Sequence, residues 1–96
     1  MTFRDATTTI RRIIENSCEG GFYRDEKIDL DNSLARISVA SKYGGAAAVL
    51  LTEIRGRIRS LSSHQGMRKY GGKYEIVRND LLTALETLES LVPMED

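Results

Sequence analysis

Residues 47–61 read AAVLLTEIRGRIRSL, and their apolar side chains recur at spacings of three and four. This period places the apolar side chains on one face of an α-helix. The face comprises Ala47, Leu50, Leu51, Ile54, Ile58 and Leu61. Gly56 weakens the helix, since glycine in a helix interior costs about 1 kcal/mol relative to alanine. The stripe continues past it, so the segment predicts an amphipathic helix packed on a core.

A second amphipathic helix is predicted at the N-terminus. Thr2 and Asp5 have the three-residue spacing of a capping box. Apolar residues then follow at helical spacing: Phe3, Ala6, Ile10, Ile13 and Ile14. We expect Gly20-Gly21 to end this helix, because glycine readily adopts the backbone conformation that terminates helices.

A third amphipathic helix is predicted from about Glu75 to Leu91, with Pro93 marking its exit. Leucine dominates its core face, which comprises Val77, Leu81, Ala84, Leu85, Leu88 and Leu91.

The segment between the first two apolar stripes is harder to assign. Residues 22–32 are polar and charged, and Ile28 and Leu30 alternate with acids. This pattern also fits a short extended piece, but we interpret the segment as a loop. A further helix is then expected to begin near Leu34, with an N-cap supplied by Asp31, Asn32 or Ser33.

That helix meets Gly44-Gly45, and two adjacent glycines cost a helix interior about 2 kcal/mol. The pair predicts either a break or one long helix with a close-packing point, where Ser41, Ala47 and Ala48 let another backbone approach. The sum is a single all-α domain spanning residues 1–96. We expect a small bundle of three to four helices with glycine-rich connections at 19–33 and 64–73.

The length of 96 residues limits the core. A chain of this size buries only about 60–65% of its unfolded surface, and self-association is a common remedy. We therefore expect a homo-oligomer. The longest apolar run, Ala46–Leu51, is far shorter than the roughly 20 residues that span a bilayer. No membrane association is expected.

Cysteine and histidine usage bears on compartment and cofactors. The N-terminus has no apolar signal-peptide core, and the single cysteine, Cys18, fits a reducing compartment. Both observations predict a cytoplasmic protein. One cysteine and one histidine provide too few ligands for a zinc or iron–sulfur site. We expect neither a metal nor another cofactor.

Charge is distributed unevenly along a chain whose formal net charge is zero. Residues 54–73 contain six basic side chains and no acid. Residues 1–53 carry seven basic and eight acidic side chains, a net of −1, and residues 74–96 carry one basic and six acidic, a net of −5. A basic segment of this kind creates a local field that attracts anions.

Three arginines of the basic segment lie on the helix over residues 47–61. Arg57 follows Glu53 by four residues, the favourable order for an ion pair. Arg55 and Arg59 lie together on the other flank without a local acid, so they repel each other by a few tenths of a kcal/mol. An external anion would compensate this repulsion, and so would an acid of the C-terminal region: Glu86, Glu89, Glu95 or Asp96.

The loop over residues 65–74 reads QGMRKYGGKY and is the second candidate site. Its glycines allow backbone N–H groups to converge on an anion, and Tyr70 or Tyr74 offers a ring for stacking on a base. Its positive charges are Arg68, Lys69 and Lys73. The spacing matches no phosphate-binding P-loop. A tight β-hairpin around Gly71-Gly72 and a plain connector are the alternatives.

One pair of residues has a spacing that is typical of a catalytic site. Arg59 and His64 have the spacing R-x4-H, which resembles the R-x4-6-H signature of the all-helical HEPN ribonucleases. The resemblance covers these two residues, and Ser60 stands where the family commonly has Asn, Asp or His. It implies that Arg59 and His64 act together on a scissile phosphate. Elsewhere, Cys18 has acidic neighbours that disfavour a thiolate, and we interpret one acidic cluster as solvated loop residues: Asp25, Glu26, Asp29 and Asp31.

Together these observations favour a small non-catalytic helical binding or regulatory module, not an enzyme. Its partner would be anionic: nucleic acid, a nucleotide ligand or an acidic protein surface. The predicted binding residues are Arg55, Arg59, Arg68, Lys69, Tyr70 and Lys73. The main alternative is a protein–protein interaction or self-assembly module, of inhibitor or adaptor type, whose basic segment pairs with an acidic protein surface. A HEPN-like ribonuclease is the third interpretation.

Overall fold

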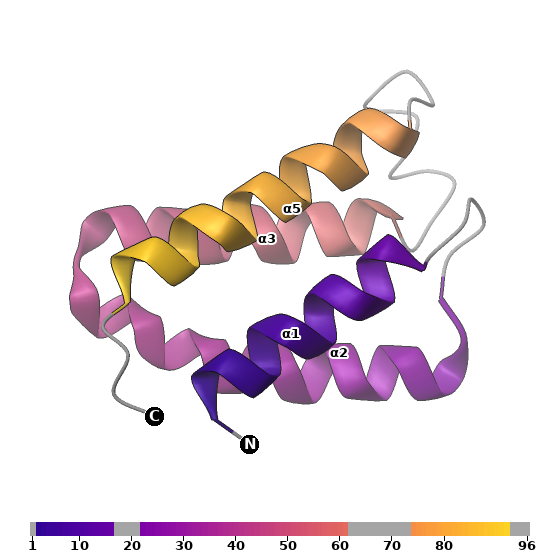
Figure 1. The fold of residues 1–96 in the computed structure, drawn as a ribbon, viewed down its shortest axis with the longest axis horizontal. Coiled ribbons are helices and arrows are strands. Elements are labelled where there is room, and N and C mark those ends of the chain that lie inside the picture. The colour runs from indigo at the N-terminus through magenta and orange to yellow at the C-terminus, as the bar shows by residue number, and fades with distance from the viewer. Residues whose placement is uncertain (1, 17–21, 62–73, 93–96) are drawn as a thin grey trace.

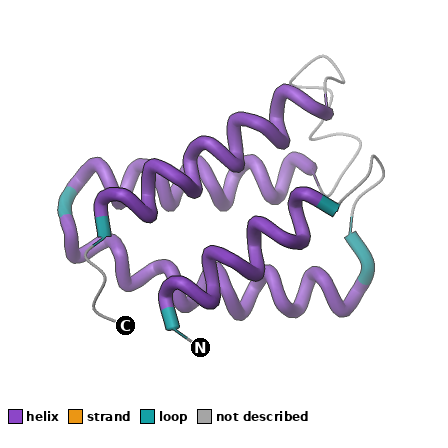
Figure 2. Tube along the Cα trace, viewed as in Figure 1, coloured by secondary structure: helices purple, strands orange, loops and turns teal. Residues whose placement is uncertain are grey.

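A computed structural model describes residues 2–16, 22–61 and 74–92 of the chain. Within these ranges the chain forms helices and no strand, which confirms the predicted all-α class (Figure 2). The elements are α1 (Phe3–Glu15), α2 (Arg24–Ile37), the 3-10 helix η1 (Ser38–Tyr43), α3 (Gly45–Leu61) and α5 (Tyr74–Leu91).

The helices form two pairs joined by η1 (Figure 1). α1 packs against α2, α3 packs against α5, and α1 also contacts α5. η1 packs on both α2 and α3 at the end where the chain passes from one pair to the other. α2 and α3 make little direct contact with each other. The described part of the bundle is therefore open along the side that these two helices share.

The N-terminal capping box is confirmed. The Thr2 hydroxyl accepts the Asp5 N–H at 3.0 Å, and an Asp5 carboxylate oxygen accepts the Thr2 N–H at 3.2 Å. The bond from the Thr2 backbone is the main cause that lowers the pKa of Asp5, because it stabilises the ionised carboxylate. The five predicted apolar residues of α1 are all buried.

The prediction of a loop over residues 22–32 was wrong, because α2 begins at Arg24. Two acids in the first turn suit the positive end of the helix dipole, and the Glu26 carboxylate accepts the Tyr23 N–H at 2.9 Å. Few residues of α2 face the core: Leu30, Ser33 and Ile37 are buried, and Leu34 is half-buried. Ile28, half of the apparent alternation with Leu30, is 50% exposed.

The expected helix start at residues 31–33 was wrong for the same reason, since these residues lie inside α2. Such a narrow apolar face is hard to recognise among the charged side chains around it.

The glycine pair breaks the helix, the first of the two predicted outcomes. Gly44 has φ 121° and ψ 174°, a conformation that is essentially restricted to glycine. It separates η1 from α3. A close-packing point is not found, because a Cβ atom placed at Gly44 or Gly45 would meet no other atom within 4 Å.

The core lies between the two pairs and combines the predicted faces of α1, α3 and α5. On α3, five of the six stripe residues are buried, and Leu50 is half-buried. On α5, the predicted face is buried except for Leu91, which is 40% exposed at the last turn and was wrongly assigned to the core. Pro93 lies outside the described residues. None of the described helices has the length and hydropathy needed to cross a bilayer.

Candidate functional site

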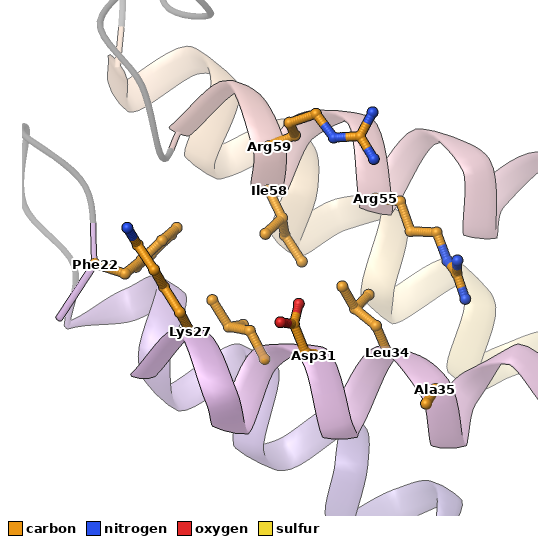
Figure 3. A pocket seen from close by; sticks show the side chains of 9 residues that line it. Phe22, Lys27, Asp31, Leu34, Ala35, Arg55, Ile58 and Arg59 are labelled. Carbon is orange, nitrogen blue, oxygen red and sulfur yellow. The ribbon is translucent and has the colours of Figure 1, made fainter. Parts of the chain in front are cut away.

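An open groove runs between α2 and α3, where the two helices lack close mutual packing (Figure 3). Its volume is about 450 Å³. The lining comes from the segment that leads into α2, from α2 and from α3: Phe22, Lys27, Leu30, Asp31, Leu34, Ala35, Arg55, Ile58 and Arg59. Arg55 and Arg59, both predicted binding residues, therefore lie on one wall of a concave site.

The charged residues of the groove are all exposed. Arg55 and Arg59 lie one turn apart on α3, and Lys27 lies across from them on α2. Asp31 is the single acid of the lining, and its carboxylate rises from α2 toward Ile58 (Figure 3). Three positive charges and one negative charge leave the lining with a formal charge of +2. Two of these positive charges, Arg55 and Arg59, belong to the basic segment over residues 54–73.

The floor of the groove is hydrocarbon. Leu30 and Ile58 are buried, and Phe22 and Leu34 are half-buried and packed against the core. The exposed Ala35 adds a small side chain at the α2 wall. Since exposed apolar surface gains about 25 cal/mol for each Å² removed from water, this floor favours an occupant with an apolar face.

Arg55 is fixed by contacts at the α2–η1 junction. Its guanidinium donates a hydrogen bond to the Ser38 hydroxyl, which in turn donates to the Leu34 carbonyl at 2.8 Å. Ser38 is neutral, so this bond orients the Arg55 side chain without neutralising its charge. In Figure 3 the Arg55 side chain reaches from α3 toward α2, whereas Arg59 extends along the α3 rim.

Two predicted ion-pair residues, Arg57 and Glu89, have other partners than those predicted. Arg57 contacts Asp80 of α5, with 3.6 Å between Nη1 and Oδ2, in place of Glu53. Glu89, a predicted partner for Arg55 and Arg59, pairs with Arg11 of α1 instead. The packing of α3 and α1 on α5 brings these distant acids within reach. Among the described residues, the contact of Arg57 with Asp80 pairs the basic segment with the acidic end, and Arg57 does not line the groove.

The four other predicted binding residues lie outside the described residues: Arg68, Lys69, Tyr70 and Lys73. His64 and Cys18 lie outside them as well, so the structure does not place the R-x4-H pair. Tyr74 is described. It begins α5 and is buried, so it does not offer the free ring that stacking on a base requires.

Sequence reasoning missed the α2 side of the groove. Asp31, predicted to be a solvated loop acid, lies on a helix and faces α3. Lys27 and Leu34 also line the groove, although the sequence pattern does not indicate them as site residues. The signal was present in the helical spacing of Lys27, Asp31 and Ala35, each four residues from the next. A spacing of four residues places side chains on one face only in a helix, so it indicates nothing for a segment that is interpreted as a loop.

Comparison with protein-family models, curated proteins and solved structures finds no match to this chain. The groove is therefore interpreted from its chemistry. Arginine stays protonated in proteins and presents a planar fork of donors that fits carboxylates and phosphates. Among the described residues, no group of three His, Cys, Asp or Glu side chains is arranged to hold a metal ion.

Proposed function

We propose that this domain is a non-catalytic binding module that docks an anionic partner in the groove between α2 and α3. The observation that carries the proposal is the placement of Arg55 and Arg59, exposed and one turn apart, above an apolar floor. The described lining offers the partner cations and hydrocarbon. Its groups suited to acid–base chemistry are the Asp31 carboxylate and the Lys27 ammonium, and both are exposed.

Electrostatics supports the same interpretation. Two like charges at positions i and i+4 of a helix destabilise it by a few tenths of a kcal/mol. An anion bound between Arg55 and Arg59 removes this repulsion and gains charge-assisted hydrogen bonds, about twice as strong as neutral ones. Two guanidinium groups at one wall of the groove therefore favour an anionic ligand at this place.

Retention on a heparin column tests the proposal, with heparin as the polyanion. Arg55→Gln/Arg59→Gln removes two charges from the groove. The matched control is Arg12→Gln/Arg24→Gln, which removes two exposed charges that do not line it. We expect the groove variant to elute at clearly lower salt than both the wild type and the control. Equal shifts for the two variants would show that net charge, and not this site, determines retention.

A further inference from the structure

We infer that two copies of this chain form a domain-swapped dimer, in which they exchange their α1–α2 pairs by straightening at Gly44. The inference concerns assembly and does not depend on an anion in the groove. Three observations carry it: the division of the fold into two pairs, the register of the buried residues across Gly44, and the helical backbone on either side of this residue.

Each pair of helices is a continuous piece of chain. α1 and α2 precede Gly44 and α3 and α5 follow it, so the chain passes from one pair to the other once. α1 contacts α5 across the division, and the core contains residues from both pairs. A second copy supplies the same contacts when the connection opens, which makes domain swapping a low-cost route to a dimer.

The buried residues of α2, η1 and α3 follow one register. Those before Gly44 are Leu30, Ser33, Ile37 and Ala40. Those after it are Ala47, Leu51, Ile54, Ile58 and Leu61. With Gly44 between them, the spacing alternates between three and four residues from position 30 to position 61. Such a seven-residue repeat forms a single stripe on one continuous helix. A chain that only reversed at Gly44 would not need this common register.

The backbone is already helical on both sides of Gly44. Ile37 and Ser38 have right-handed helical dihedrals, so α2 continues into η1 without a break. The 3-10 conformation of η1 differs little from an α-helix, and a long 3-10 stretch of this kind often marks a hinge. The Gly44 carbonyl accepts the Ala48 N–H at 3.2 Å, as in an α-helix. Helical dihedrals at Gly44, with a small adjustment of η1, therefore join the three elements into one helix.

The joined helix over residues 24–61 is about 57 Å long at roughly 1.5 Å per residue. The two pairs then lie end to end along it, so α1 no longer reaches α5 of its own chain. A second copy restores this contact, because α2 and α3 run antiparallel in the closed form (Figure 1). In a two-fold dimer, α2 of each copy takes its place beside α3 of the other, and both cores are completed.

Gly44 determines the balance between the two forms. Its present conformation is costly for residues other than glycine, whereas glycine inside a helix is unfavourable relative to alanine. Gly44→Ala therefore disfavours the closed form and favours the joined helix. Because the change acts on both chains, it should lower the dimer dissociation constant by about a hundredfold or more. Dilution favours the monomer, so unfolding at low protein concentration still measures the stability of the closed form.

Gly45→Pro should have the opposite effect. Gly45 is the first residue of α3 in the closed form, where proline is well tolerated, and an added Cβ meets nothing within 4 Å. Inside the joined helix, proline removes a backbone hydrogen bond and clashes with the preceding turn. This variant should stay monomeric at concentrations at which the wild type dimerises. Gly56→Ala, inside α3 in both forms, should leave the dimer dissociation constant unchanged.

Cross-linking shows which chain supplies each contact. Arg11 of α1 contacts Glu89 of α5. A short bismaleimide added to Arg11→Cys/Glu89→Cys, in a Cys18→Ser background, should join two chains in the dimer and link a single chain in the monomer. Gel electrophoresis separates the products. Arg57→Cys/Asp80→Cys is the matched control, because it links α3 to α5 of the same chain in both forms.

The inference predicts that Gly44→Ala, refolded at high protein concentration, increases the inter-chain links between positions 11 and 89, and that Gly45→Pro abolishes them. A dimer that contains these links only within each chain would show association without exchange and overturn the inference. A Gly44→Ala variant that stays monomeric would overturn it too. If Gly44→Ala does not fold, the wild type and Gly45→Pro decide, and equal inter-chain links in these two chains would exclude the joined helix.

Discussion

Replacing Gly44 by alanine tests how the groove is built. The Gly44 backbone, at φ 121° and ψ 174°, turns the chain from η1 into α3. An added Cβ meets nothing within 4 Å, so the cost is confined to the backbone conformation. Residues other than glycine pay about 1–3 kcal/mol in this region. Gly44→Ala should lower the free energy of unfolding by that amount.

Gly56→Ala is the matched control, because it makes the same chemical change at a position that is equally open. Gly56 lies inside α3, where alanine should stabilise the helix by about 1 kcal/mol. Gly44→Ala should therefore lower the free energy of unfolding and Gly56→Ala should raise it, so that the two variants differ by about 2–4 kcal/mol. Urea unfolding measures this difference. A Gly44→Ala variant as stable as the wild type would refute the positive φ, and with it the described path from α2 to α3.

Three further predictions concern the core, the first helix and assembly. Leu85→Ala, at a fully buried position, should lower the free energy of unfolding by about 2–5 kcal/mol in the same assay. Hydrogen bonding lowers the pKa of Asp5 below its ordinary value of 3.8. The cap therefore stabilises the fold fully above about pH 3.8, and this stabilisation is lost as the pH falls through the lowered pKa. The stability advantage of the wild type over Asp5→Asn should therefore shrink in acid, and a constant advantage would contradict the cap. Sedimentation should show a dimer or larger species at micromolar concentration, unchanged in Arg55→Gln/Arg59→Gln. A monomer refutes self-association, and a dimer lost in the variant places the groove in the assembly.

The predictable part of the fold is the part with wide apolar faces. α1, α3 and α5 each repeat apolar residues over three or more turns, and a period of that length is unambiguous. α2 was missed because its core face is little more than Leu30, Ser33, Leu34 and Ile37. Serine carries no hydrophobic signal, although its small side chain is buried here. The packing of α2 on α1 makes it a helix, and a linear pattern does not contain that contact.

The candidate site likewise has a part that the sequence predicts and a part that it does not. Arg55 and Arg59 were predictable, since both lie on a strongly periodic helix and lack a local acid. The residues that surround them from distant parts of the chain were not predictable. Ser38, Asp31 and Phe22 come close to α3 only because the chain reverses at η1 and Gly44. Side chains brought together by such a reversal leave no fixed spacing in the sequence.

The central claim is that the anionic partner docks between α2 and α3. Amide chemical-shift changes, recorded while unlabelled poly-glutamate is added to the isotopically labelled domain, test it most directly. The account predicts that the largest changes fall on residues 22–35 and 51–59, and that they disappear in Arg55→Gln/Arg59→Gln but persist in Arg12→Gln/Arg24→Gln. Changes confined to residues 62–73, or spread over α1 and α5, would contradict the groove as the binding site.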